Sequence, residues 1–95
     1  MEKLNAFRKA CDRVAEFVEE SDVEYPRSMS EACVIQFNNM NNGLESDIIL
    51  TYDVDKGGYK LRYDRYEEVT GSLHINNLSD INGEVINRLF RKVDE

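Results

Sequence analysis

The sequence predicts a small α+β domain in which an antiparallel sheet is covered on one face by two helices. Near both ends of the chain, apolar residues recur at steps of three and four, which is typical of amphipathic helices. Between these ends, apolar and polar residues alternate with period two, which indicates half-buried strands. The 95 residues are enough for one core and too few for two. The expected order is therefore α-β-β-β-(β)-α, in a single domain that spans residues 1–95.

The first helix is expected over residues 2–20, where no glycine or proline interrupts the apolar stripe. This stripe consists of Leu4, Phe7, Ala10, Cys11, Val14, Phe17 and Val18. Residues 21–30 are expected to form a polar connector, which holds the only proline of the chain, Pro26. Because a proline restricts the residue before it, Tyr25 is expected to be extended.

Three strands are expected in the middle of the chain, over residues 31–37, 47–55 and 59–66. Each has one apolar face, and the residues of these inward faces are Cys33, Ile35, Phe37, Ile48, Leu50, Tyr52, Val54, Tyr59, Leu61 and Tyr63. The Asn-rich segment 38–43 and the Gly-containing segment 55–58 favour tight turns. The three strands are therefore expected to form an antiparallel meander.

The second of these turns allows two registers. A turn at residues 57–58 places Asp55 opposite Lys60, whereas a turn at residues 56–57 places Asp53 opposite Lys60. The first register also brings a second acid opposite a base, and each such pair contributes about 0.2–1 kcal/mol. Charge pairing therefore favours the first register, and both registers keep the same inward face.

A fourth strand and a second helix complete the expected fold. The strand covers residues 69–75, with Gly71 as a bulge or bend. Asn77 or Ser79 is expected to cap a helix over residues 80–93. The apolar stripe of this helix consists of Ile81, Val85, Ile86, Leu89, Phe90 and Val93.

Charge and cysteine content exclude several functional classes. The chain has 19 acidic and 12 basic residues and a net charge of −7, the wrong sign for direct binding of nucleic acid. No apolar run approaches the roughly 20 residues of a membrane span, and the polar N-terminus lacks a signal-peptide core. Cys11 and Cys33 fall on apolar registers and form no CxxC motif. They are expected to be buried and reduced, with a disulfide as the alternative. These observations favour a cytoplasmic protein.

The acidic residues are concentrated around the end of the first expected helix. Five acids and no base lie within residues 16–24. An acid at a helix C-terminus is unfavourable by about 0.3–1 kcal/mol, so this placement opposes the helix dipole. It predicts an electronegative patch for a basic partner, and the alternative is a solvated helix end whose charges are screened. Tyrosines beside acids extend the predicted partner-binding set, which is Glu16, Glu19, Glu20, Asp22, Glu24, Tyr25, Tyr66, Glu67 and Glu68.

Neither a catalytic site nor a metal or cofactor site is predicted. Residues 53–64 resemble a calcium-binding loop at its start, but the fifth position is Gly57 and the last is Asp64, where a glutamate is expected. The only histidine, His74, lies on the outward register of its strand, where a surface role is the usual one. The chain is therefore expected not to be an enzyme.

The function that these observations favour is a non-enzymatic, acidic protein-binding module or inhibitor. It would present carboxylates to a basic protein surface, such as the site of a nucleic-acid-binding protein, and so mimic a nucleic acid. In size, charge and predicted fold class the chain resembles the small acidic proteins that phages encode against host defences, such as anti-CRISPR and anti-restriction proteins. No motif carries this resemblance, so it assigns no site residues.

Two other functions remain open. The first alternative is a structural or regulatory module that assembles, for example as a homodimer, through its sheet edge or its outer face. Val34 and Ile49, if they are neighbours, form an apolar spot on that face. The second alternative is a domain that binds a small ligand or an ion.

Overall fold

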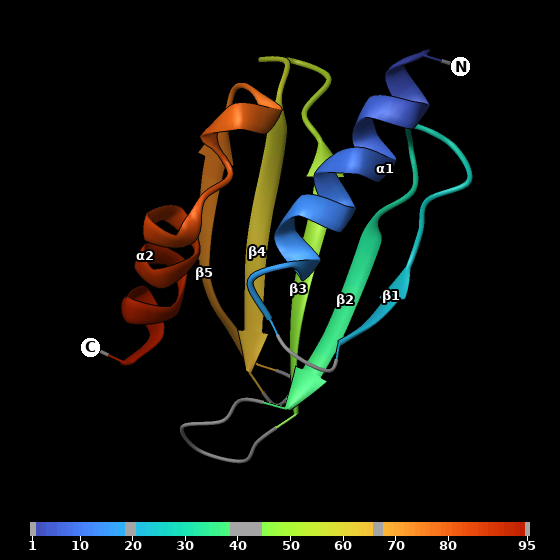
Figure 1. The fold of residues 1–95 in the computed structure, drawn as a ribbon. Helices are drawn as coiled ribbons and strands as arrows, with labels where there is room; N and C mark the ends of the chain where they lie inside the picture. Colours follow the sequence, from blue (N-terminus) through green and yellow to red (C-terminus); the bar gives the residue numbers. More distant parts are fainter. Residues whose placement is uncertain (1, 19–20, 39–44, 66–67, 95) are drawn as a thin grey trace.

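The computed structural model describes residues 2–18, 21–38, 45–65 and 68–94, and within them two helices pack on one face of a five-stranded antiparallel sheet (Figure 1). The elements are α1 (Glu2–Ala15), β1 (Asp22–Glu24), β2 (Cys33–Asn38), β3 (Glu45–Tyr52), β4 (Tyr59–Arg65), β5 (Glu68–Ile75), the 3₁₀ turn η1 (Leu78–Asp80) and α2 (Gly83–Asp94). The predicted α+β class is confirmed. Neither α1 nor α2 has the length and apolar character of a membrane span.

The strands follow one another in the sheet in the order of the sequence, β1-β2-β3-β4-β5, so the predicted meander is confirmed. The fourth predicted strand is β5. Tyr63 pairs with Gly71 and Asp64 with Val69, so Thr70 is an extra residue beside the glycine that was expected to mark a bulge.

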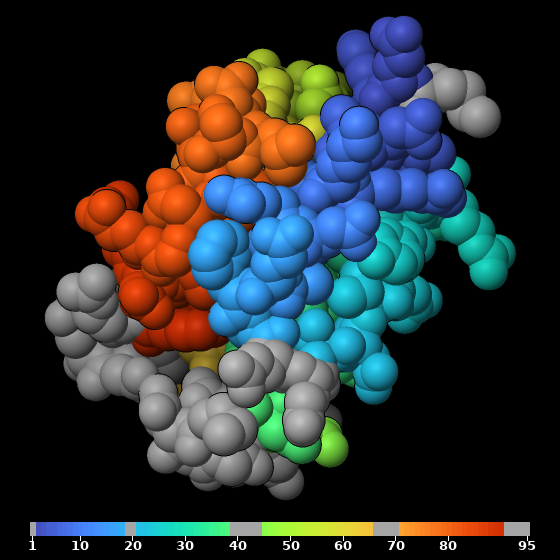
Figure 2. Space-filling view, viewed as in Figure 1, coloured from blue at the N-terminus to red at the C-terminus, as the bar shows by residue number. Residues whose placement is uncertain are grey.

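The core lies between the helices and the sheet, and it contains most of the residues that the periodicities assign to it. Val54 and Phe17, which were also assigned to apolar faces, are exposed. α1 crosses in front of β2 and β3, and α2 lies beside β5 at the left of the view (Figure 1). Seen from the same side, the two helices and the segment between β5 and α2 cover most of the sheet (Figure 2). The buried apolar residues are Phe7, Ala10, Cys11, Val14, Val18, Cys33, Ile35, Phe37, Ile48, Leu50, Tyr59, Leu61, Tyr63, Ile75, Ile81, Ile86 and Leu89. Each large side chain among them stabilises the fold by about 1.5–3 kcal/mol through burial.

Aromatic packing joins α2 to the sheet. The ring of Phe90 lies 4.9 Å from that of Tyr63 and 5.8 Å from that of Phe37, between centroids. Such contacts favour tilted rings, and the angles between these ring planes are 55° and 36°. The second helix is thereby fixed against β2 and β4, whose residues lie far apart in the sequence.

The first helix is shorter than predicted, because it ends at Ala15 and not at residue 20. After Ala15 the backbone hydrogen bonds span three residues instead of four. The amide of Phe17 donates to the carbonyl of Val14, and that of Val18 donates to the carbonyl of Ala15. Val18 still reaches the core, with 8% of its surface exposed. The apolar spacing therefore continued past the end of the helix, which explains why periodicity placed that end too late.

The shorter helix changes which charges lie in its two end turns. Glu2 lies in the first turn of α1 and Arg13 in the last, which are the favourable signs at both ends. Glu16 follows the helix and forms an ion pair with Arg13, with 3.5 Å between Oε2 and Nη1. Glu16 lies one residue beyond Ala15, and Glu19 and Glu20 lie outside the described residues, so the opposition between these acids and the helix dipole stays a prediction.

The predicted connector 21–30 contains an edge strand, β1. Val23 pairs with Ile35 of β2 and packs against the core, while Asp22 and Glu24 point to the other face. Three residues are too few for a recognisable alternation of apolar and polar residues. The strand is therefore identified only by its pairing with β2 in the structure.

The hairpin between β3 and β4 differs from both predicted registers. Tyr52 pairs with Tyr59, so Thr51 and not an aspartate faces Lys60. β3 ends at Tyr52, and Val54, which was assigned to the inward face, is 81% exposed. The six residues 53–58 form the connection, because Asp53 bonds to the loop instead of to the opposite strand.

The last helix also begins later than predicted. η1 (Leu78–Asp80) precedes it, and the amide of Val85 donates to Oδ1 of Asn82 at 3.0 Å. Asn82, and neither Asn77 nor Ser79, therefore caps α2. Ile81 is buried although it lies before the helix.

Candidate protein-binding surface

Because both helices pack on one face of the sheet, the described residues leave the opposite face uncovered (Figure 1). We call this surface the open face. Its side chains come from positions that alternate with the buried ones along each strand. They are Asp22, Glu24, Val34, Gln36, Asn38, Glu45, Asp47, Ile49, Thr51, Lys60, Arg62, Asp64, Ser72 and His74.

One row across the open face has an apolar centre. Glu24 pairs with Val34, Val34 with Ile49, and Ile49 with Arg62. Val34 and Ile49 are therefore direct neighbours, which is the condition for the apolar spot that the sequence suggested. Both are half-buried. The row places an acid at one end of this apolar pair and a base at the other.

The adjacent row consists mostly of carboxylates. Asp22 pairs with Gln36, Gln36 with Asp47, and Asp47 with Asp64. Two like charges thus lie directly opposite each other on β3 and β4, an arrangement that destabilises a sheet.

The two facing carboxylates differ in their partners. Arg62 binds Asp64 with two hydrogen bonds, Nε to Oδ1 and Nη2 to Oδ2, both 3.0 Å long. No basic group in the described part of the chain pairs with the carboxylate of Asp47. Burial raises the pKa of Asp47, and the charges of Asp64 and Glu45 raise it further. The ionised form of this half-buried acid is therefore less favourable than that of a fully exposed aspartate.

The structure separates the predicted partner-binding residues. Asp22 and Glu24 lie on the open face, next to Gln36 and Val34. Glu16 lies after α1, on the side of the sheet that carries the helices, and is paired with Arg13. Glu68 is the first residue of β5. Glu19, Glu20, Tyr66 and Glu67 lie outside the described residues.

Tyr25 connects the segment after β1 to α1. Its hydroxyl donates a hydrogen bond to Oδ1 of Asp12, and this bond raises the pKa of Tyr25 to about 12. Beside it, Nε of Arg8 donates to the carbonyl of Pro26 at 3.2 Å. The hydroxyl of Tyr25 is therefore engaged within the molecule, while 44% of the residue is exposed.

Sequence reasoning missed Asp47, Arg62 and Asp64 as members of a charged surface. Each alternates with apolar inward residues of its strand, but Asp47 is distant from the other two along the chain and the three form no acidic run. Their proximity depends on the register of the β3–β4 hairpin, and that register follows from the length of the loop.

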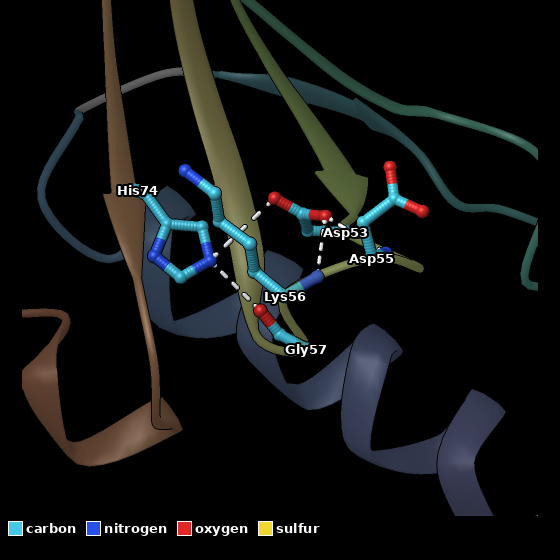
Figure 3. A network of polar contacts seen from close by, with 5 residues as sticks. All are labelled: Asp53, Asp55, Lys56, Gly57 and His74. Carbon is cyan, nitrogen blue, oxygen red and sulfur yellow. Dashed lines mark hydrogen bonds and ion pairs between the residues drawn. The ribbon is translucent and has the colours of Figure 1, made fainter.

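The same loop makes a polar network with His74 (Figure 3). Nε2 of His74 lies 2.8 Å from the carbonyl oxygen of Gly57 and 3.6 Å from Oδ2 of Asp53. Oδ1 of Asp53 accepts the amide hydrogens of Asp55 and Lys56, at 3.1 and 3.0 Å. The bond from Lys56, followed by smaller contributions from Asp55 and His74, lowers the pKa of Asp53.

These contacts hold the loop in shape, because Asp53 and His74 both bond to its backbone. They give a structural role to Asp53, the first residue of the segment that resembled a calcium-binding loop. Within the described ranges, no three His, Cys, Asp or Glu side chains come together in a group that is able to hold a metal ion.

Comparison with models of known protein families, with curated proteins and with solved structures finds no match to this chain.

Proposed function

We propose that this protein is a non-enzymatic binding protein whose open face docks a basic surface of another protein, such as the site of a nucleic-acid-binding protein. The observation that carries the proposal is the pair of facing carboxylates, Asp47 and Asp64. Arg62 neutralises only Asp64. Asp47 thus offers a site for a cation that the described part of the chain does not supply.

The facing carboxylates destabilise the free protein. Like charges directly opposite each other on neighbouring strands cost about 0.2–1 kcal/mol, and the partial burial of Asp47 adds to this cost. A lysine or arginine placed beside Asp47 by a partner would offset both effects. Features that lower stability without a local compensation are typical of binding sites.

The apolar pair at the centre of the open face supplies the second requirement of an interface. Val34 and Ile49 are neighbours, and Glu24 and Asp47 lie next to them on the same face. Stable interfaces combine an apolar centre with a polar rim, and rim charges accelerate the approach of an oppositely charged partner. The open face therefore suits a segment in which Lys or Arg residues flank an apolar side chain.

The charge of the open face disfavours the alternative of a dimer formed through this surface. Five carboxylates of the described strands lie on it, those of Asp22, Glu24, Glu45, Asp47 and Asp64, against Lys60 and Arg62. Arg62 is already bonded to Asp64. Two copies that met through this face would bring two acidic surfaces together, which opposes association. A basic partner has the complementary charge.

The proposal is tested first by locating the binding surface. The probe is a synthetic peptide in which lysine and arginine flank leucine, added to isotope-labelled protein while amide chemical shifts are recorded. We expect the changes to concentrate at Val34, Asp47 and Ile49, and the affinity to fall as salt is raised. Changes centred on α1 or α2 would contradict the proposal.

A pair of matched variants then separates the open face from net charge. Glu24→Lys with Asp47→Lys alters the open face, whereas Glu2→Lys with Glu84→Lys makes the same change in net charge on the helices. We expect at least a tenfold loss of peptide affinity, about 1.4 kcal/mol, in the first variant and a much smaller loss in the second. Equal losses would mean that only net charge matters. A dimer that persists at all salt concentrations in light scattering would instead favour the alternative of self-assembly.

A further inference from the structure

The charges of the open face are not spread evenly over its strands. Asp22 and Glu24 lie at one side of the face, on β1, whereas Lys60 and Arg62 follow each other on β4. Lys60 is exposed, and no carboxylate in the described part of the chain pairs with it. The side chain of Arg62 is 43% exposed, and its bonds to Asp64 use two of the five guanidinium N–H groups. The open face is therefore acidic on one side and carries two bases on the other.

On the acidic side, three carboxylates surround a neutral and exposed side chain, that of Gln36. Its direct neighbours on the adjacent strands are Asp22 and Asp47, and Glu24 is a diagonal neighbour. Directly paired side chains lie about 5 Å apart on a sheet, and diagonal ones about 7–8 Å. A cation above Gln36 is therefore within reach of all three carboxylates, including that of Asp47.

The apolar pair lies between this point and the two bases. The path from Gln36 to the midpoint of Lys60 and Arg62 crosses two strand spacings, about 9.5 Å, and three residues along the strands, about 10 Å. Its length is therefore about 14 Å. The middle of the path lies over Ile49, beside Val34. Acids, apolar centre and bases thus lie on one diagonal line across the open face.

The hairpin loop that precedes Lys60 does not supply an acid for the two bases. Oδ1 of its Asp53 accepts the amide hydrogens of Asp55 and Lys56, and Oδ2 lies 3.6 Å from Nε2 of His74. A partner that carried only basic side chains along the diagonal line would meet Lys60 with a charge of the same sign, which opposes binding.

We propose that the partner places on this line an extended segment with a base, an apolar residue and an acid at alternate positions. The base lies over Gln36 and the apolar side chain over Ile49. The acid lies between Lys60 and Arg62. In an extended chain, alternate side chains share one face, and the first and fifth residues are about 13–14 Å apart, which matches the line. This inference rests on the proposed function and deepens it, because it assigns one acidic group to a partner surface that is otherwise basic.

Two blocked peptides test this charge pattern by titration of isotope-labelled protein. One has the sequence Lys-Thr-Leu-Thr-Glu and the other Lys-Thr-Leu-Thr-Lys. We expect the glutamate peptide to bind at least about threefold more tightly, although attraction by the net charge of −7 alone would favour the peptide with two lysines. Equal or weaker binding of the glutamate peptide would overturn the inference.

The titrations also separate this inference from the proposed function. If the peptide with two lysines shifts the amides of Val34, Asp47 and Ile49 and binds as tightly as the other, the proposed function stands and the inference fails. If neither peptide shifts these amides, both fail.

A pair of matched variants assigns the preference to the basic side. Lys60→Glu reverses one charge of the open face, whereas Lys9→Glu makes the same change at an exposed position of α1. We expect Lys60→Glu to bind the peptide with two lysines more tightly than the glutamate peptide, and Lys9→Glu to keep the wild-type preference. A wild-type preference in Lys60→Glu would contradict the placement of the acid. If Lys60→Glu fails to fold, the two titrations of the wild type still decide the question.

A nitroxide label next to the lysine of the glutamate peptide measures the orientation of the bound segment. It should broaden the amide signals of Val23 and Gln36 more than those of Lys60 and Arg62. A label next to the glutamate should give the opposite pattern. The same broadening from both labels, or a reversed order, would show that the segment does not lie on the diagonal line as proposed.

Discussion

At the scale of single residues, Gly57 and Gly58 share a backbone conformation but differ in their surroundings. Their φ angles are 73° and 76°, in the region that favours glycine. A Cβ atom on Gly58 would lie 2.2 Å from the carbonyl oxygen of Ile75, whereas one on Gly57 would meet nothing within 4 Å. At Gly58, therefore, the backbone of the hairpin loop packs closely against the backbone at the end of β5.

This difference predicts unequal effects of two identical substitutions. Gly57→Ala should lower the free energy of unfolding by about 1–2 kcal/mol, the cost of a left-handed conformation. Gly58→Ala should lower it by at least about 1 kcal/mol more, because a backbone contact must also shift. Urea denaturation of both variants measures the difference. Equal losses would show that the loop does not pack on β5 as described.

Asp47 predicts a dependence of stability on pH. Its pKa is raised in the folded state, so folding favours the protonated form, and ionisation destabilises the protein as the pH rises through that pKa. Asp47→Asn should therefore increase the free energy of unfolding at pH 7, by about 0.2–1 kcal/mol. The gain should shrink at pH 3, where the carboxyl group is protonated in both states.

The matched control for Asp47 is Asp55→Asn, which changes an exposed aspartate in the hairpin loop. It should leave stability nearly unchanged at both values of pH. Urea denaturation of the two variants at pH 7 and pH 3 tests the prediction. A loss of stability in Asp47→Asn at pH 7 would mean that Asp47 has a stabilising partner.

At the scale of elements, Arg13 joins the end of α1 to the segment before α2. Its Nε donates to the carbonyl of Ile81 at 3.0 Å, and its guanidinium lies 5.5 Å from the centre of the Phe17 ring. Arg13→Ala should therefore lower the free energy of unfolding by about 1–3 kcal/mol. Lys9→Ala, at an exposed position of the same helix, should change it by less than about 0.5 kcal/mol. Thermal or urea unfolding of both variants measures the contrast, and similar losses would contradict this role of Arg13.

The identity of the elements could be predicted better than their ends. The inward faces of β2 and β4 were predicted because alternation is a local pattern. The end of α1 was not, because Phe17 and Val18 continue the apolar spacing while the backbone has already turned. β1 was missed because Val23 is the only one of its three residues that packs against the core.

At the scale of the whole molecule, the acidic residues behind the net charge of −7 are distributed differently in the fold than along the chain. Along the chain the acids gather in residues 16–24. In the fold, Asp22 and Glu24 join Asp47 and Asp64 on the open face, while Glu16 pairs with Arg13. The acidic surface is therefore assembled from β1, β3 and β4, and not from one segment.

This distribution predicts a response of the free protein to salt. Screening acts over about 10 Å at 0.1 M salt, which spans the spacing of adjacent strands. The melting temperature should rise with sodium chloride at low ionic strength, and it should rise less in the variant that combines Glu24→Lys with Asp47→Lys. Scanning calorimetry across ionic strength tests this. The same rise in both proteins would mean that the charge repulsion does not come from the carboxylates of the open face.

The sequence by itself determined the fold class, the order of the main elements and almost all of the core, because these follow from periodicities within single segments. It also located buried positions for Cys11 and Cys33. Only the tertiary structure decided that Val34 meets Ile49 and that Asp47 faces Asp64. The physical reason is the same in each case. These contacts join segments that are distant in sequence, and loop lengths and strand registers bring them together, where a shift of one residue would change every neighbour.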